Sequence, residues 1–201
     1  MVISISPTAG IRCQVGDFSV IVDPSTKRTP TAKGGRQAET AKKGQLTLFT
    51  KATAPLSALG SPDIIQGPGE YEMFGIRVRG VALTAPDSKT LHTAYAAEFD
   101  DIHLAFLADI QGVPSEQVLD RLGAVDILFL SADERAVASK QAVSLIKQID
   151  PSITIPLTDA VAKKIAEEMG QKLKAEDKLV TKKKDIEKED SAHKLIWLKT
   201  V

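Results

Sequence analysis

The sequence has little cysteine, no excess of charge of either sign and no long apolar run. Its 201 residues include one cysteine, which excludes an intramolecular disulfide and a cysteine-rich zinc module. The 26 basic and 26 acidic side chains give a net charge of zero, so the overall charge gives no reason to expect nucleic acid. No apolar run approaches the roughly 18 residues of a membrane span, and the amino terminus lacks the charged-then-apolar order of a signal peptide. These absences predict a cytoplasmic, globular protein without a membrane partner.

Length and composition predict a single domain that spans residues 1–201. Hydrophobic residues make up 43% of the chain, which is enough for a sizeable core. Two stretches depart from the rest: a basic loop at 24–45 and a charged insertion at 159–192. The basic loop holds only Glu39 as an acid, against Lys27, Arg28, Lys33, Arg36, Lys42 and Lys43. Because it has no aromatic residue for base stacking, a solvated insertion is favoured over an anion-binding or RNA-binding flap.

The first half of the chain is typical of strands. Ile11, Cys13 and Val15 alternate with Arg12 and Gln14, which predicts a half-buried strand with the Cys13 thiol in the core. Further strands are expected at 18–22, 46–49, 76–81, 93–99 and 102–108, where apolar residues alternate or form short runs.

From Pro114 onward, helices are expected to alternate with strands. Helices are predicted at 114–122, at 139–149 with Ser139 as N-cap, and from a capping Asp159 to about residue 169. Residues 172–190 are predicted to form a loose hairpin or loop. Strands followed by alternating helices and strands indicate an α/β fold, an αββα sandwich of two packed mixed β-sheets with helices outside.

Several short motifs carry a resemblance to a known family. They are Val22-Asp23-Pro24, Ile65-Gln66-Gly67-Pro68-Gly69-Glu70-Tyr71-Glu72, Leu107-Ala108-Asp109, Val125-Asp126-Ile127-Leu128-Phe129 and Ile149-Asp150-Pro151-Ser152-Ile153-Thr154-Ile155-Pro156. This series resembles the metallo-β-lactamase fold, in particular small bacterial metal-dependent hydrolases similar to ascorbate-6-phosphate lactonase. The resemblance implies hydrolysis by one or two zinc, manganese or iron ions held by histidines and an aspartate, which lower the pKa of a bound water.

The metal ligands that the resemblance implies are missing. The family's His-x-His-x-Asp-His signature falls on 50–55, which includes Thr50, Lys51 and Ala52; its amino-terminal Gly-His falls on 7–8, and its final histidine on Thr158. None of these residues replaces a histidine or aspartate well, and only Asp109 keeps the residue of the bridging aspartate. We therefore expect no catalytic residue, no metal and no cofactor. The vestigial pocket would consist of Thr8, Asp23, Thr50, Lys51, Ala52, Asp109 and Thr158.

Other residues offer no substitute with clear ligand spacing. The three histidines, His92, His103 and His193, show neither i, i+2 nor i, i+4 spacing, so a structural or solvent-facing role is favoured for each. A carboxylate-only site of Asp23, Glu70 and Asp109 stays open, as does a Lys51 ammonium that pairs with Asp109 in place of a metal.

Three functions remain as hypotheses. The leading one is a non-catalytic binding or structural relative of metal-dependent hydrolases. The first alternative is an active hydrolase of phosphoester or lactone substrates with an altered site, in which zinc or manganese would act. The second alternative is an RNA-binding protein that uses the basic loop. A protein partner or a homo-oligomer is possible for the leading hypothesis, and the sequence identifies no partner.

Overall fold

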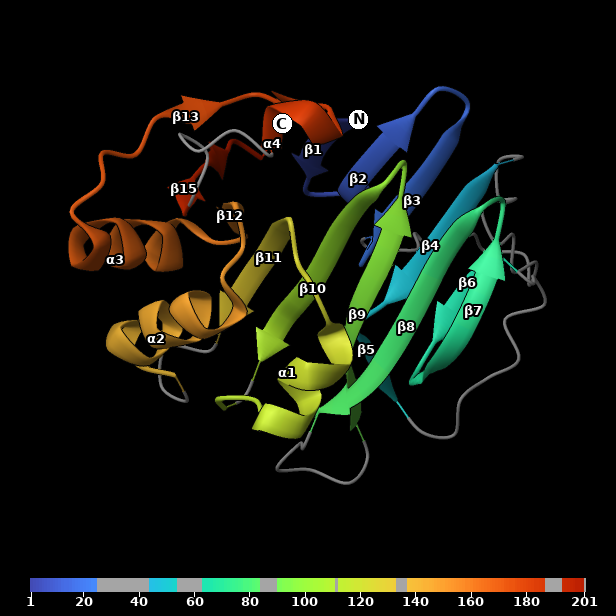
Figure 1. Cartoon of the computed structure of the whole chain (residues 1–201), viewed down its shortest axis with the longest axis horizontal. Coiled ribbons are helices and arrows are strands. Elements are labelled where there is room, and N and C mark those ends of the chain that lie inside the picture. The colour runs from blue at the N-terminus through green and yellow to red at the C-terminus, as the bar shows by residue number, and fades with distance from the viewer. Residues whose placement is uncertain are drawn as a thin grey trace, which may run out of the picture.

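A computed structural model describes most of the chain. It covers residues 1–24, 44–53, 63–83, 90–110, 112–132, 137–186 and 193–200, without the side chains of Thr53, Asp109 and Ala132. Except at its two ends, the predicted basic loop at 24–45 lies outside the described residues. Two β-sheets pack face to face, and helices cover the outer face of the larger one (Figure 1).

The smaller sheet has the strand order β14-β1-β2-β3-β4-β6. Its strands are β1 (Val2–Ser6), β2 (Gly10–Val15), β3 (Phe18–Val22), β4 (Gln45–Phe49), β6 (Ile64–Gln66) and β14 (Leu179–Val180). The first three strands form an antiparallel meander, whereas β3, β4 and β6 run parallel. Cys13 of β2 is fully buried between the sheets, as the alternation predicted, and this burial raises the pKa of its thiol.

The larger sheet has the order β15-β12-β11-β10-β9-β8-β7, and β5 pairs with β9 beside this path. Its strands are β5 (Lys51–Thr53), β7 (Gly69–Met73), β8 (Ile76–Leu83), β9 (Thr90–Phe99), β10 (Ile102–Ile110), β11 (Ile127–Ala132), β12 (Ile153–Pro156) and β15 (Lys194–Leu195). Strands β10, β11, β12 and β15 run parallel, and the pairs β7–β8, β8–β9 and β9–β10 are antiparallel. A short parallel pair joins β13 (Ala175–Glu176) to β16 (Trp197–Leu198).

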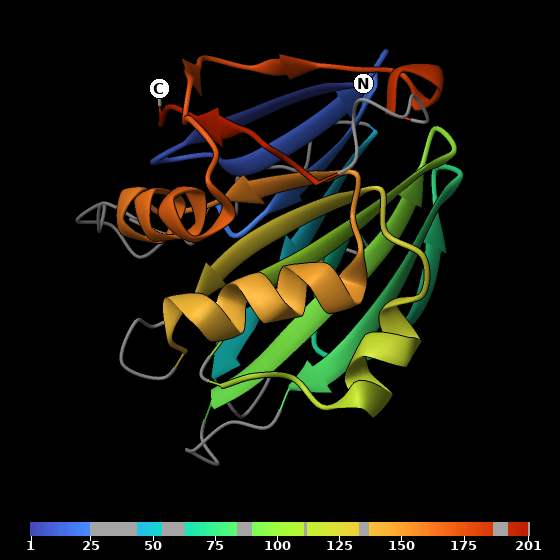
Figure 2. The ribbon, with the colours of Figure 1, turned by 60° about the vertical axis from the view of Figure 1, so that its left-hand side comes forward.

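The helices are α1 (Glu116–Leu122), α2 (Ser139–Ile149), α3 (Asp159–Met169) and the single turn α4 (Lys183–Ile186). One apolar core lies between the two sheets, and a second lies between the larger sheet and α1, α2 and α3 (Figures 1 and 2). The predicted α/β sandwich of two mixed sheets with helices outside is confirmed. Within the described residues, no helix is long and apolar enough to cross a membrane.

Two predicted N-caps are wrong by one residue. The N-cap of α2 is Ala138 rather than Ser139, and its backbone N–H donates to the Gln141 side chain at 3.0 Å. The N-cap of α3 is Thr158 rather than Asp159, because the Thr158 hydroxyl accepts a hydrogen bond from the Val161 N–H at 3.4 Å. Helix α1 starts after Ser115 instead of at Pro114.

The segment after α3 is not the loose hairpin or loop that was predicted. Its strand β14 pairs antiparallel with β1, with Leu179 opposite Ile3, and β13 pairs with β16 instead of with β14. Leu179 and Ile186 are buried in the core between the sheets. The segment therefore completes one edge of the smaller sheet and closes one end of its core.

Candidate functional site

The topology brings strand ends from both sheets to one edge of the sandwich. Strands β3 and β4 are parallel and end together, and β4 leads through Thr50 into β5. Strand β5 pairs with the beginning of β9, with Lys51 opposite His92. Because β10 is antiparallel to β9, and β11 and β12 are parallel to β10, the carboxyl ends of these three strands lie at the same edge. We call it the strand-end edge.

The strand-end edge gathers the predicted pocket residues. Asp23 follows β3, Thr50 follows β4 and Thr158 follows β12, while Asp109 is the penultimate residue of β10. Thr8 is exposed in the turn between β1 and β2, which lies beside the end of β3 because Ile11 pairs with Val22. The side chain of Asp109, and with it the predicted contact to Lys51, lies outside the described residues.

Asp23 and Thr50 form the best-defined contact at this edge. The backbone N–H of Thr50 donates to Oδ1 of Asp23 at 2.8 Å, and the Thr50 hydroxyl donates to Oδ2. The Asp23 N–H in turn donates to the Leu48 carbonyl at 3.0 Å. Asp23 has a left-handed backbone with φ of 49°. One carboxylate thus ties the end of β3 to the end of β4.

The close approach of Gly10 constrains the same turn. A Cβ at Gly10 would lie 2.2 Å from the Val22 carbonyl oxygen and 2.6 Å from that of Asp23. Any side chain at this position would therefore displace the backbone that carries Asp23.

Four described side chains of the predicted pocket offer no good ligand to a metal ion. Thr50 is 2% exposed, and its hydroxyl proton is directed to Asp23. Ala52 is buried and has no donor atom, and Lys51 is exposed and cationic. The Thr158 hydroxyl accepts from the first turn of α3. Zinc sites in proteins are built from imidazole, thiolate or carboxylate donors, which these four side chains lack.

Tyr95 was missed by sequence reasoning, although it connects several parts of the edge. Its hydroxyl accepts from the Gly67 N–H at 3.0 Å and lies 3.1 Å from the Phe49 carbonyl, to which it can donate. The side chain is buried, which raises the pKa of the phenol. A Cβ at Gly80 would lie 2.8 Å from the Gly67 carbonyl oxygen and 2.9 Å from the Tyr95 ring. The Gly67-Pro68-Gly69 turn is thus a structural support of the edge.

Two of the three histidines lie apart from Asp23 and Thr50, whereas His92 lies opposite Lys51, next to Thr93, whose N–H donates to the Thr50 carbonyl. His103 lies beside Asp126, with its Nδ1 3.2 Å from the carboxylate, and His193 pairs with Asp150, also at 3.2 Å. His92 is 6% exposed on the face that carries Lys51, and among the described residues its Nδ1 has no hydrogen-bond partner.

The carboxylate-only site is not assembled in the part of the chain that the structure describes. Glu70 binds Arg79 on the outer face of the larger sheet rather than joining Asp23. No three His, Cys, Asp or Glu side chains among the described residues are grouped as metal ligands.

Comparison with known proteins identifies the family and supports the fold. Residues 8–158 match the sequence model described as "Beta-lactamase superfamily domain". A search of curated proteins gave no match. A Thermotoga maritima protein, described as a candidate Zn-dependent hydrolase of the metallo-beta-lactamase superfamily, aligns over 100% of this chain and 99% of its own, with 12% identity and a TM-score of 0.70.

Two further solved structures show the same fold. A metallo hydrolase from the archaeon Ignicoccus hospitalis aligns over 90% of this chain and 99% of its own, with 13% identity and a TM-score of 0.59. The metallo-beta-lactamase fold protein YhfI from Bacillus subtilis aligns over 99% of this chain and 96% of its own, with 10% identity and a TM-score of 0.56. At these identities the likeness concerns the fold alone.

Proposed function

The chain belongs to the metallo-β-lactamase superfamily, and on that premise we propose that it is a non-catalytic member with a binding or structural role. The observation that carries this proposal is the contact between Asp23 and Thr50. Where the resemblance expects the first histidine ligand, the chain has a buried threonine whose N–H and hydroxyl both donate to a carboxylate.

The hydrogen bonds between Asp23 and Thr50 and the charge of Lys51 both oppose metal binding. Hydrogen bonds to a charged group contribute about 1.5–3 kcal/mol each, so an arrangement that turned Thr50 away from Asp23 would lose stability. The neighbouring Lys51 ammonium would in addition repel a cation placed beside it. The strand-end edge is therefore better suited to hold two strands together than to activate water.

The proposal extends to the branch of the superfamily, the location of the protein and its partner. The Gly67-Pro68-Gly69-Glu70 motif supports a place among the bacterial proteins similar to ascorbate-6-phosphate lactonase, although here it turns the chain under Tyr95. We propose a cytoplasmic protein that needs neither zinc nor manganese and that acts through a protein partner or as a homo-oligomer. The alternative of RNA binding by the basic loop concerns residues that lie almost entirely outside those described.

Metal titration tests the proposal. Thermal unfolding of the full chain is followed with excess Zn²⁺ and Mn²⁺, and heats of binding are measured by calorimetry. A specific site occupied at 100 times its Kd would stabilise the fold by about 2.7 kcal/mol, which is readily visible as a rise in Tm. We expect no such rise, no saturable heat and no hydrolysis of p-nitrophenyl phosphate or of a lactone. Saturable binding with metal-dependent hydrolysis would contradict the proposal.

A further inference from the structure

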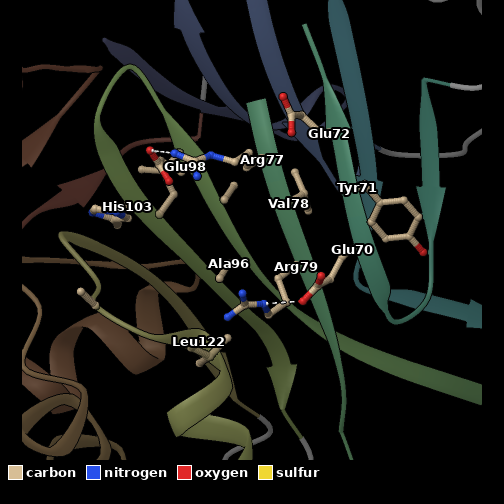
Figure 3. Close-up of a pocket in the computed structure, with 13 residues that line it drawn as sticks. Glu70, Tyr71, Glu72, Arg77, Val78, Arg79, Ala96, Glu98, His103 and Leu122 are labelled. Atoms are coloured by element: carbon tan, nitrogen blue, oxygen red, sulfur yellow. Dashed lines mark hydrogen bonds and ion pairs between the residues drawn. The ribbon is translucent and has the colours of Figure 1, made fainter. Parts of the chain in front are cut away.

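A hollow on the outer face of the larger sheet lies apart from the strand-end edge. It has a volume of about 360 Å³ and extends over β7, β8, β9 and β10, with Leu122 at the end of α1 and Ala124 as one wall (Figure 3). Ala96 of β9 lies in its floor. The hollow exists because this alanine is surrounded by long charged side chains.

Two rows of cross-strand neighbours border the hollow. One row runs from Glu72 through Arg77 and Glu98 to His103. The other runs from Glu70 through Arg79 to Ala96. Within these rows the guanidinium of Arg77 binds the Glu98 carboxylate, and Nε of Arg79 donates to Glu70 at 3.2 Å.

Arg79 is held in place from a second side. Its Nη1 donates to the Arg121 carbonyl at the end of α1, at 3.1 Å. This contact holds the guanidinium beside Ala96, as Figure 3 shows, while Nη2 has no partner among the described residues. Across the hollow, Glu98 uses Oε1 for Arg77, and its Oε2 has no partner within the described part of the chain. One unused donor group and one unused acceptor thus border the same space.

We propose that this hollow binds a small zwitterion with the dimensions of a dipeptide. Its carboxylate binds Arg79, its ammonium group binds Oε2 of Glu98, and its apolar body lies on Ala96 and Leu122. A simple anion would meet the carboxylates of Glu70 and Glu98, and a simple cation would meet two guanidinium groups, so the charges favour a ligand of both signs over an ion of one sign.

The strand geometry is compatible with this ligand. The Cα atoms of Glu98 and Ala96 are separated by about 6.6 Å, because the two residues lie two positions apart on one face of β9, and Arg79 is the cross-strand neighbour of Ala96. An extended dipeptide spans up to about 7 Å. The volume lies at the lower end of the roughly 300–1,000 Å³ of small-molecule pockets. Glu70 is 79% exposed, and an exposed ion pair contributes little to stability, so a ligand carboxylate can share Arg79 at little cost.

Calorimetry and amide NMR shifts of the full chain test the proposal with three matched probes. Alanylalanine carries both charges, N-acetyl-alanylalanine lacks the ammonium group, and alanylalanine amide lacks the carboxylate. We expect saturable shifts in β8 and β9 with alanylalanine, and at least tenfold weaker binding of each blocked peptide. No saturable binding of alanylalanine, or equal binding of all three probes, would overturn the proposal.

Three variants locate the binding. Arg79→Gln is expected to weaken alanylalanine binding at least tenfold, and Ala96→Leu to abolish it by filling the floor without any change of charge. The control is Arg121→Gln, which removes the same charge nearby but keeps the backbone carbonyl that holds Arg79; its affinity should stay within twofold of the wild type. Unchanged affinity in Arg79→Gln would overturn the proposal even if Ala96→Leu failed to fold.

Discussion

The hydroxyl of Thr50 is the side-chain donor that binds Asp23 where β3 and β4 end. Thr50→Val keeps the shape of the side chain but leaves one oxygen of Asp23 without its O–H donor. Because a half-buried, charged acceptor then loses a hydrogen bond, we expect the free energy of unfolding to fall by about 1–3 kcal/mol. Urea denaturation measures it, with Thr50→Ser as the control that restores the donor. Equal stability of the valine and serine variants would contradict this role.

The buried phenol of Tyr95 makes stability depend on alkaline pH. Its pKa is raised by burial, so the folded state keeps a proton that the unfolded state loses near pH 10. The contribution of the Tyr95 phenol to the free energy of unfolding is therefore complete below pH 10. It is lost as the pH rises further, at up to about 1.4 kcal/mol per pH unit. Cys13 adds a loss of the same sign above about pH 8.5.

The Tyr95→Phe variant separates the effect of the Tyr95 phenol on alkaline stability from that of the Cys13 thiol. At pH 7 we expect a loss of about 1–3 kcal/mol, because the Gly67 N–H loses its acceptor in a buried place. Above pH 10 the variant should show a shallower decline of stability than the wild type. Denaturation curves at pH 7 and at pH 10.5 check both statements, and parallel pH profiles of the two proteins would refute the assignment to Tyr95.

Among the elements, the edge strand β15 depends on one glutamine after α3. Gln171 donates through Nε2 to the His193 carbonyl at 2.9 Å and accepts from the Leu195 N–H at 3.1 Å, as a neighbouring strand would. Gln171→Ala should lower stability by about 1–2 kcal/mol. Amide hydrogen exchange should become faster at Leu195 but not in β10. Unchanged protection at Leu195 would show that the side chain does not hold the strand.

The elements also show which parts of the fold a sequence can reveal. The alternation of Ile76 and Val78 with Arg77 and Arg79 predicted a strand in the place of β8, since buried and exposed positions alternate over these four residues. Strands β13 and β14 were missed because each has two residues, too few to show a period. Their partners, β16 and β1, lie far away in the sequence, so only tertiary packing selects them.

At the scale of the whole molecule, the resemblance located several residues of the strand-end edge, and the structure supplied their contacts. Asp23 and Thr50 are 27 positions apart, and only the parallel pairing of β3 with β4 brings them together. The support from Tyr95 depends on the register of β8 and β9, which places Gly80 beside Tyr95. The hollow over Ala96 likewise depends on cross-strand neighbours and the end of α1, which no local pattern specifies.

The metal content of the whole protein tests the central claim most directly. The chain is purified without chelator from cells grown with zinc, manganese and iron, and its metals are measured by elemental analysis. The donor types at Thr50, Lys51, Ala52 and Thr158 predict no stoichiometric metal, and a Tm that a chelator leaves unchanged, since no metal binding is coupled to folding. One or more zinc, manganese or iron ions per chain, with a Tm that falls when they are removed, would contradict the claim.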